Sequence, residues 1–457
     1  MRRNPPGPEW PAALALFALV FVTHSLCPNA TSSDSYWVVP QMVSVLIRGD
    51  TSLGEYPDLL REHTYRGIDC IDSAYRISTP DPAAGCPPSS RYYYHYPFGP
   101  AVVALPPMVA MDAVLRVAGP PLLRVLGSRV SPPVRSFLAR DYPHTRPLAE
   151  LVLASFLMAV ATAFVFLTGR HFLPRSSAIL LALLFAYGTA AWSTGSRALW
   201  QHGPEMLMFS IAVYLLVKAG QRPWLLPWSA VPLVLAYFIR PTGAIAVAPI
   251  GLMVLIHHRR QFLQWAVLAA ATAAPFLAYN FALYHRQLQP YFTQQGFLDP
   301  ALGNVPPFLS ALAGQCLSPS RGLFVFSPFL LFALPGIWLA FRRNWQTPLV
   351  HYLAAILLLH WIAISAFADW TAGSSYGPRY FSDVTPIFIF FLIPVVIWAG
   401  AHRSPTAVAA FALAALIAFG IHFRGAVNWD VERWNDPGVN PARAWDWKDP
   451  QFLRGLH

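Results

Sequence analysis

Residues 148–167 read LAELVLASFLMAVATAFVFL, twenty positions of which only Glu150 is charged. A helix needs about twenty predominantly apolar residues to cross the roughly 30 Å hydrocarbon core of a bilayer. The apolar residues of this stretch are not confined to one stripe, as they would be in a surface helix of a soluble protein. The stretch therefore predicts a transmembrane helix.

Comparable apolar runs recur along the chain, and residues 262–283, 323–341 and 348–367 also have the length of a membrane span. The 457 residues are 55% hydrophobic and only 12% charged, a composition that favours a membrane protein over a soluble one. We therefore expect an all-α fold, a polytopic transmembrane bundle of about eleven spans in which residues 1–457 form a single integral membrane domain.

Basic residues in short loops indicate the orientation, because such loops favour the cytoplasm. The segments assigned inside by this rule are Arg2 and Arg3, residues 170–175, 218–222 and 257–260, Arg342 and Arg343, and His402 and Arg403. The expected N-terminus is cytoplasmic, and the first loop (residues 28–98) and the C-terminal tail (residues 422–457) are extracytoplasmic. Residues 99–147 combine an apolar run with many arginines, so this segment crosses either not at all or twice. We expect a partly embedded helix there.

The first outer loop has its own organisation. Pro40 can begin a helix that Gly49 ends, and the residues between them predict a short helix on the membrane surface. Its expected apolar face is Met42, Val43, Leu46 and Ile47, and its expected polar face is Gln41, Ser44 and Arg48. Cys70 and Cys86 lie in the same loop. They either form a disulfide in an oxidising compartment or remain two unpaired cysteines.

Several classes of protein lack support in the sequence. There is no Gly-rich phosphate loop, no GxSxG or HExxH motif and no His/Cys cluster, so ATP-driven transport and zinc chemistry lack their usual signatures. The net charge of +11 is expected to serve contacts with membrane lipids and phosphate groups rather than nucleic acid. No metal or other cofactor is expected, although a divalent metal stays open.

Several short motifs resemble a known family. Asp34 follows the first apolar run, Gly49-Asp50 lies in the long outer loop, and Tyr94-His95-Tyr96-Pro97-Phe98-Gly99-Pro100 leads into the next apolar run. Further motifs are Ser196-Arg197, Arg240-Pro241-Thr242-Gly243, Ser318-Pro319-Ser320-Arg321-Gly322 and Ser375-Tyr376-Gly377-Pro378-Arg379-Tyr380. Together they are similar to the GT-C class of membrane glycosyltransferases, which includes protein O-mannosyltransferases and the lipid A aminoarabinose transferase.

This resemblance implies a sugar donor carried on polyprenyl phosphate and an inverting transfer at the outer face of the cytoplasmic membrane. The expected acceptor is a lipid, a lipid-linked glycan or a protein. One departure is that many members have Asp-Glu where this chain has Asp34-Ser35. A role that depends on the second carboxylate, such as holding a divalent metal, is therefore not implied for this chain.

The chemistry of such a transfer assigns roles to residue types. Arginine binds phosphate oxygens bidentately, so Arg379 and Arg321 are expected at the leaving phosphate, with Arg240 and Arg197 in reserve. The alternative for each is an arginine that snorkels to lipid headgroups. Because polyprenyl phosphate is already a good leaving group, the remaining task is to activate the acceptor hydroxyl.

Asp34 is the expected general base, with its pKa raised by partial burial. A loop-capping carboxylate is the alternative reading, and Asp50, Glu55 and Asp369 are alternative acids. The residues expected to contact the substrate are His95, Tyr96, Tyr376 and His202. An interfacial aromatic belt is the simpler account of such residues.

A second functional class, a transporter or flippase of lipid-linked glycans, would use a similar basic groove. It would require ionisable residues that face one another in mid-membrane. A non-catalytic scaffold for envelope assembly is a third class. A single outer cavity that contains Asp34 and Arg379 would favour the transferase.

Overall fold

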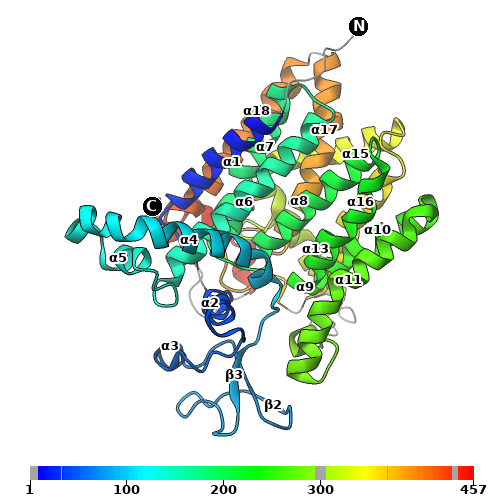
Figure 1. Cartoon of the computed structure of the whole chain (residues 1–457). Coiled ribbons are helices and arrows are strands. Elements are labelled where there is room, and N and C mark those ends of the chain that lie inside the picture. Colours follow the sequence, from blue (N-terminus) through cyan, green and yellow to red (C-terminus); the bar gives the residue numbers. More distant parts are fainter. Residues whose placement is uncertain are drawn as a thin grey trace.

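The computed structural model describes residues 9–31, 33–293, 305–367, 369–402, 404–434 and 441–456. Three of the basic residues used for orientation, Arg2, Arg3 and Arg403, lie outside these ranges, as does part of the predicted tail. The described chain is predominantly helical, and its few strands are confined to the first loop (Figure 1). The prediction of an all-α class is confirmed.

Helices of ten or more residues form the bundle, apart from α2 (Val38–Arg48), which is described below. Its helices are α1 (Trp10–Ser25), α4 (Gly99–Leu126), α6 (Arg146–Arg170), α7 (Arg175–Tyr187), α8 (His202–Ala219), α9 (Ala230–Ile239), α10 (Ala244–His257), α11 (Arg259–Tyr284), α13 (Val305–Leu317), α15 (Ala333–Arg342), α16 (Leu349–Ser365), α17 (Thr385–His402) and α18 (Pro405–Val427). Helix α6 contains the stretch 148–167 and packs against α1, α7 and α8. Most of its side chains are buried, because neighbouring helices surround it.

Five helical segments in the described ranges are long and apolar enough to cross a membrane: α4, α6, α11, Ser382–His402 and α18. The prediction of about eleven such spans is therefore wrong. The main physical reason is that glycine and proline interrupt the other apolar runs. The run 323–341, for example, is divided at Ser327 and Pro328 into α14 (Leu323–Phe326), a short 3₁₀ turn and α15.

Residues 99–147 form a helical hairpin. Helix α4 continues for 28 residues through four internal prolines and ends at Gly127. The chain then turns back through α5 (Pro132–Leu138), which packs against α4. The predicted helix is present, but it is longer than the expected run, and α4 alone has the length of a span.

A helix is present where the surface helix was predicted, as α2 (Val38–Arg48); it begins two residues before Pro40 and ends at Gly49 in a left-handed conformation with φ of 73°. The predicted polar face is wrong in part. Gln41 and Ser44 are buried, because this helix packs against α4 and α6. The exposed apolar side chains are Leu46 and Ile47 in the last turn.

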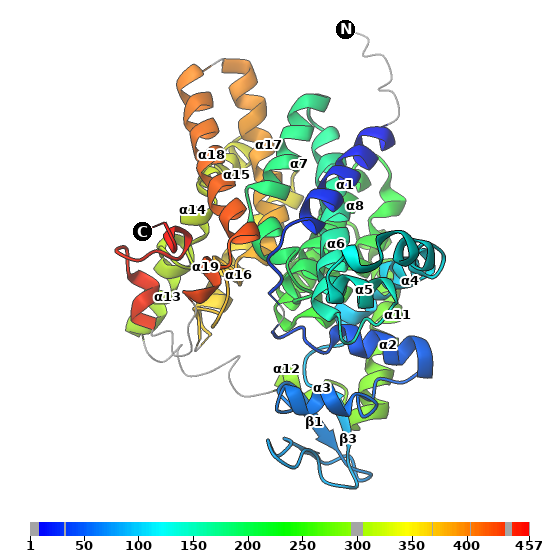
Figure 2. The same cartoon turned by 90° about the vertical axis from the view of Figure 1, so that its left-hand side faces the viewer.

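A small subdomain follows α2 and lies at the end of the molecule away from the N-terminus (Figure 2). This loop subdomain, residues 50–98, contains α3 (Pro57–Glu62) and an antiparallel sheet in the order β2 (Ile77–Ser78), β1 (Ile68–Ile71), β3 (Arg91–Tyr94). Its strands were not predicted. They are only two to four residues long, too short for a clear alternating pattern.

A disulfide between Cys70 and Cys86 closes this subdomain, so the pairing predicted as one of two alternatives is confirmed. We expect the double substitution Cys70→Ser and Cys86→Ser to destabilise the loop subdomain by about 2–4 kcal/mol, because the unfolded loop gains conformational entropy. Non-reducing peptide mapping should recover both cysteines in one linked peptide, and limited proteolysis should cut the double variant faster within residues 50–98. Two free thiols after oxidising purification would contradict this prediction.

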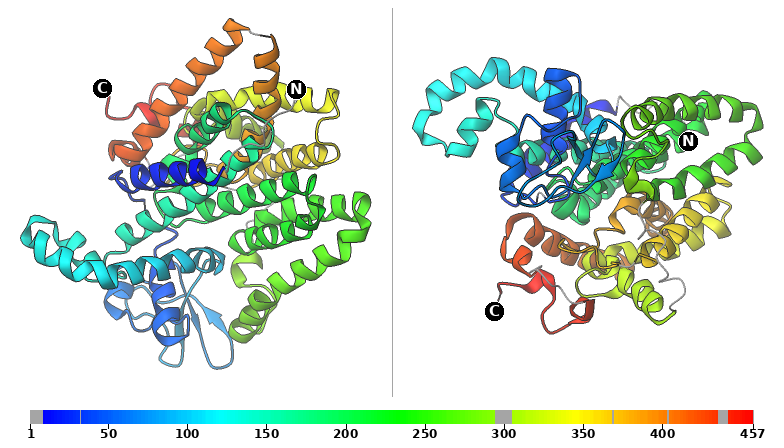
Figure 3. Two further views of the ribbon diagram at one scale, coloured as in Figure 1. Left: turned by 45° about the horizontal axis from the view of Figure 1, so that its top comes forward. Right: turned by 90° about the horizontal axis from the view of Figure 1, so that it is seen from below.

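The basic loops meet at the other end of the bundle. Arg170, at the end of α6, forms an ion pair with Glu9 at the start of α1, and Phe172 packs against Trp345 with ring centroids 4.8 Å apart. Helix α18 continues past His422 to Val427, so the tail begins six residues later than predicted, at residue 428. The tail lies beside α13, where Ala444, Ala311 and Trp370 form one buried cluster (Figure 3).

Candidate functional site

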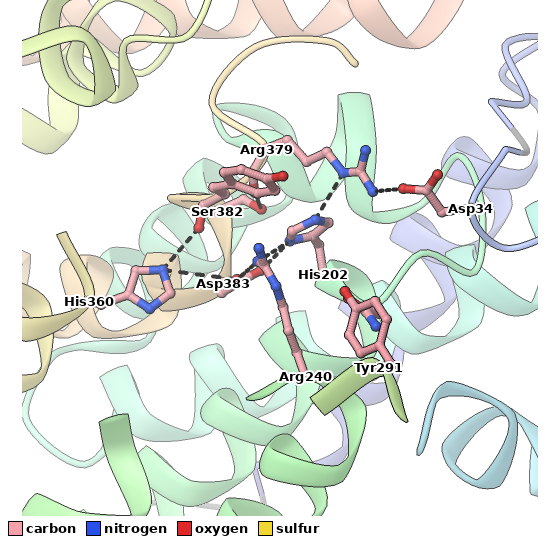
Figure 4. Close-up of polar contacts among 10 residues, drawn as sticks. Asp34, His202, Arg240, Tyr291, His360, Arg379, Ser382 and Asp383 are labelled. Carbon is pink, nitrogen blue, oxygen red and sulfur yellow. Dashed lines mark hydrogen bonds and ion pairs between the residues drawn. The ribbon is translucent and has the colours of Figure 1, made fainter. Parts of the chain in front are cut away.

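Five charged or polar side chains from distant parts of the chain meet in one network (Figure 4). They are Asp34 from the loop between α1 and α2, His202 at the start of α8, Arg240 directly after α9, and Arg379 and Asp383 from the segment that leads into α17. Each residue lies at or near a helix end on the side of the bundle that carries the loop subdomain. Four of the five were candidate site residues in the sequence analysis, and Asp383 was not among them.

The first contact of the network joins Asp34 and Arg379. The Nη2 group of Arg379 donates a hydrogen bond to Oδ2 of Asp34, and the two side chains are 12% and 28% exposed. The guanidinium also lies over the indole of Trp200, with 4.2 Å from Cζ to the ring centroid. The planar guanidinium is therefore held by an aromatic face and a carboxylate at the same time.

The Asp34–Arg379 contact changes the acidity of both groups. Burial, the largest single influence, would raise the pKa of Asp34, but the positive charge of Arg379 and its hydrogen bond to the carboxylate, with a smaller contribution from Arg66, together hold the pKa below its usual value. Burial would likewise lower the pKa of Arg379, and the Asp34 carboxylate instead raises it. The predicted increase in the pKa of Asp34 is therefore wrong, because the sequence could not show that Arg379 would be its partner.

His202 connects this pair to a second, deeper pair. The Nε group of Arg379 can only donate a hydrogen bond, and it lies 3.0 Å from Nε2 of His202. Nε2 therefore accepts, and the imidazole proton resides on Nδ1, which lies 2.5 Å from Oδ1 of Asp383. His202 is therefore neutral, and its Nε2 fixes the orientation of the Arg379 guanidinium by accepting this hydrogen bond.

The deeper pair consists of Asp383 and Arg240, which are 0% and 3% exposed and joined through Oδ2 and Nη1. The guanidinium of Arg240 lies 4.7 Å from the ring centroid of Tyr380. His360 of α16 approaches Oδ2 of Asp383 to 4.0 Å and donates from Nε2 to the Tyr380 carbonyl at 2.9 Å. The network therefore has no net charge. It contains two carboxylates and two guanidinium groups, and the neutral imidazole of His202 connects the two pairs.

Asp34 and Arg379 line a pocket together with aromatic side chains. The other lining residues are Ser35, Val38, Tyr94, Tyr96, Pro100, Leu199, Trp200 and Gln201. The pocket encloses only about 10 Å³, roughly the space of one water molecule. The pocket as it stands has no room for a ligand larger than water.

Glu150 supports the turn that carries Asp34. Its Oε2 accepts a hydrogen bond of 2.5 Å from the Ser35 hydroxyl and one of 3.0 Å from the amide of Leu199. One carboxylate on α6 thereby fixes the chain on both sides of the pocket, next to Asp34 and next to Trp200. The signal in the sequence was Glu150 itself, the single charged residue of the stretch 148–167, and its role was not predicted.

Three predicted site residues lie elsewhere in structural positions. Arg197 is fully buried and donates to backbone carbonyls of His24, Cys27, Asn29 and Trp192, which fixes the chain before Asp34. Arg321 binds the carbonyls of Thr371, Gly373 and Ser320 and the side chain of Gln451 in the tail. Tyr376 donates to the Ile421 carbonyl at 2.7 Å. Buried arginines of this kind satisfy backbone groups at helix ends, so a phosphate-binding role for Arg197 and Arg321 is not supported.

Tyr96 and His95 differ in their relation to the pocket. Tyr96 lines it, whereas the neighbouring His95 pairs with Asp69 of β1, 3.0 Å from Nδ1 to Oδ1. The rings of both residues contact Tyr291 of α12 (Pro290–Thr293). None of the alternative acids lines the pocket: Glu55 pairs with Arg48, and Asp50 and Asp369 are at least partly exposed.

Among the residues that the structure describes, no group of three or more His, Cys, Asp and Glu side chains is arranged to hold a metal ion. Comparison with known proteins adds no further assignment. No protein-family model matches the chain, and neither a curated protein nor a solved structure matches it.

Proposed function

We propose that this chain is an inverting membrane glycosyltransferase that moves a sugar from polyprenyl phosphate to an envelope acceptor, a lipid, a lipid-linked glycan or a protein. The observation that carries the proposal is the pair of Asp34 and Arg379 in a small aromatic pocket at one end of an apolar helical bundle. Such a pocket offers a group for the leaving phosphate and a group for the acceptor proton within hydrogen-bond distance of each other.

An exchange of anions at Arg379 explains how the closed pocket can admit the donor. The phosphate of a polyprenyl-phosphate sugar would replace the Asp34 carboxylate on the guanidinium, which is suited to bidentate phosphate contacts. Asp34 is then separated from its positive partner but remains largely buried. Since burial alone raises its pKa, donor binding converts Asp34 from a weak base into a stronger one.

The transfer itself needs one base and no external acid. Asp34 takes the proton from the acceptor hydroxyl, whose oxygen forms a bond to the anomeric carbon on the face opposite the phosphate. The bond between that carbon and the phosphate oxygen breaks with its electron pair, so the configuration inverts and polyprenyl phosphate leaves. Arg379 stabilises the charge that develops on the phosphate, and His202 and Trp200 hold its guanidinium in a fixed orientation.

The proposed location is the extracytoplasmic face of the cytoplasmic membrane. The basic loops around Arg170 and Trp345 lie at one end of the bundle, and basic loops favour the cytoplasm. The pocket and the disulfide-bonded loop subdomain lie at the other end, and disulfides persist in oxidising compartments. Sugars carried on polyprenyl phosphate suit that face, because the lipid presents them at the membrane surface.

A flippase for lipid-linked glycans is the second candidate, and the buried network of Asp383, Arg240 and His202 is the observation in its favour. Buried ionisable groups in a membrane protein often mark a transport path. In this chain the three residues lie at the ends of α17, α9 and α8 rather than at mid-helix, on the same side as the Asp34 pocket. This placement favours transfer at one face.

The substitution Arg379→Lys should weaken donor binding and slow transfer together. Lysine keeps the positive charge but cannot donate to His202 and to the phosphate from one planar group. We expect kcat/KM to fall about 10²- to 10³-fold, as for the loss of one preorganised donor to a developing negative charge. Donor binding is measured separately by titration with polyprenyl phosphate. If the variant binds polyprenyl phosphate and transfers the sugar as the unmodified protein does, Arg379 does not belong to the site.

The proposal is tested in cells by mass spectrometry of envelope glycans, lipids and glycoproteins with and without the chain. A glycosyltransferase predicts the loss of one sugar from a defined acceptor and the accumulation of that acceptor in unmodified form. The Asp34→Asn variant should reproduce this profile, because it retains the fold and lacks the base. An unchanged set of glycan structures, with only their amounts or their side of the membrane altered, would contradict the proposal and favour the flippase.

A further inference from the structure

The hairpin of α4 and α5, residues 99–140, projects from the bundle (Figures 1 and 3) and is rich in arginine. It contains five arginines and a single acidic residue, Asp112; the arginines are Arg116, Arg124, Arg129, Arg135 and Arg140. All five are exposed. Apolar side chains of α4 are exposed beside them, notably Val114, Val117 and Val125 at 63%, 77% and 72%. A surface with both properties suits the region where lipid tails meet headgroups.

An apolar groove lies between this hairpin and the bundle. Side chains of α1, α4, α5 and α6 line it, including Phe21, Met111, Leu115, Phe137 and Phe156. It encloses about 320 Å³, within the range of roughly 300–1,000 Å³ that is typical of small-molecule sites. Its walls are almost entirely hydrocarbon, so it would accept an alkyl chain and no polar ligand.

Charged residues stand at the edge of the groove. Asp112 accepts hydrogen bonds from Arg116 at 3.1 Å, from Arg140 at 2.7 Å and from Tyr142 at 3.0 Å. The ring of Tyr142 packs on Phe137 of the groove wall, with centroids 5.9 Å apart, and so joins the rim to the groove. Two guanidinium groups share one carboxylate, which leaves an excess of positive charge beside an apolar channel.

We propose that this groove and its rim bind an anionic phospholipid, with one acyl chain along the groove and the headgroup phosphate on Arg116 and Arg140. Neither the groove nor the rim alone identifies the ligand. Together they require a ligand that carries an alkyl chain next to a phosphate, as a phospholipid does. The proposed sugar donor fits less well, because its phosphate has its own arginine, Arg379, in the separate pocket. This inference rests on the proposed function only in assigning polyprenyl phosphate to the separate pocket; the groove and its rim are the same for a transferase, a flippase or a scaffold.

Native mass spectrometry of the full-length protein in neutral detergent tests the site. The protein is titrated with dioleoylphosphatidylglycerol, with dioleoylphosphatidylcholine, with polyprenyl phosphate and with inorganic phosphate. Two variants address the two parts of the site: Arg116→Ala with Arg140→Ala for the rim, and Ala110→Trp for the groove. Ala110 lines the groove and is exposed, so a larger side chain there fills the channel without disturbing the core. The matched control, Arg61→Ala with Arg91→Ala, removes two exposed arginines from the loop subdomain.

We expect phosphatidylglycerol to bind more tightly than phosphatidylcholine, and each variant to weaken it about tenfold or more, since each basic residue near an anionic lipid contributes appreciably to binding. The control should bind as the unmodified protein does. Equal binding by the Ala110→Trp variant would overturn the proposal. So would tighter binding of polyprenyl phosphate that is lost in the same variant, because the groove would then belong to the isoprenoid. Displacement of phosphatidylglycerol by inorganic phosphate alone would also overturn the proposal, since the acyl chain of the lipid would then contribute nothing to binding.

Discussion

Replacing Asp34 by Asn should lower the turnover of sugar transfer by about 10² to 10⁴, the usual contribution of a general base. Asparagine keeps the size of the side chain and its ability to accept a hydrogen bond from Arg379, but it cannot take a proton at neutral pH. Binding of polyprenyl phosphate should survive, or even tighten, because the phosphate no longer competes with a carboxylate for Arg379. Transfer and binding are measured separately on purified protein in lipid, so the two effects can be distinguished.

The matched control for this variant is Asp50→Asn, which makes the same chemical change in the same outer loop. Asp50 is partly exposed and does not line the pocket, so its variant should retain near-normal turnover. The pH profile gives a second check. Arg379 lowers the pKa of Asp34, so the acidic limb of kcat/KM should lie below the usual range for aspartate, with activity present above it and lost as the pH falls through it. Near-normal turnover of Asp34→Asn would exclude Asp34 as the base.

Replacing Asp383 by Asn should destabilise the protein by about 3–5 kcal/mol, the usual cost of removing one partner from a buried ion pair. The substitution leaves the guanidinium of Arg240, which is 3% exposed, without its counter-charge. It also replaces the charged oxygen that accepts the His202 Nδ1 proton by an uncharged amide oxygen, so this hydrogen bond should weaken and the orientation of Arg379 should loosen. Denaturant unfolding in detergent measures the first effect, and titration with polyprenyl phosphate measures the second.

Two further variants make this prediction specific. Asp369→Asn is the matched control, because Asp369 is exposed, and its free energy of unfolding should change by no more than about 0.5 kcal/mol. Adding Arg240→Gln to Asp383→Asn removes both charges and should recover much of the lost stability, since no buried charge then remains unpaired. If Asp383→Asn costs no more than Asp369→Asn, the buried pair does not stabilise this network.

The sequence predicted most about the parts of the fold that depend on local pattern. The apolar stretch 148–167 forms a helix within α6, and Gly49 ends α2 as predicted. The cysteines of the first loop also pair. The number of long spans was overestimated, because hydropathy does not register the breaks at residues such as Pro328. The exposure of Gln41 and Ser44 was predicted wrongly, because it depends on helices that are far away in the chain.

The candidate site shows the same division. Asp34, Arg379, His202 and Arg240 were identified from residue type and position near the ends of apolar runs, and they do meet. Arg321 and Arg197 have the same local signature but bind backbone carbonyls, and only their tertiary partners distinguish them. Asp383 was missed, because a lone aspartate before an apolar run is common at the start of a helix. Its role arises from contacts with α8 and α9, which are separated from it by more than a hundred residues.

Transfer of a labelled sugar by purified protein tests the central claim most directly. The protein is reconstituted in liposomes with polyprenyl phosphate that carries a labelled sugar, and an envelope extract from cells lacking the chain supplies the unmodified acceptor. We predict that the label leaves the lipid, appears in a new glycosidic bond of inverted configuration, and does so only when Asp34 is present. Labelled donor that crosses the bilayer without forming a new glycosidic bond would contradict the account.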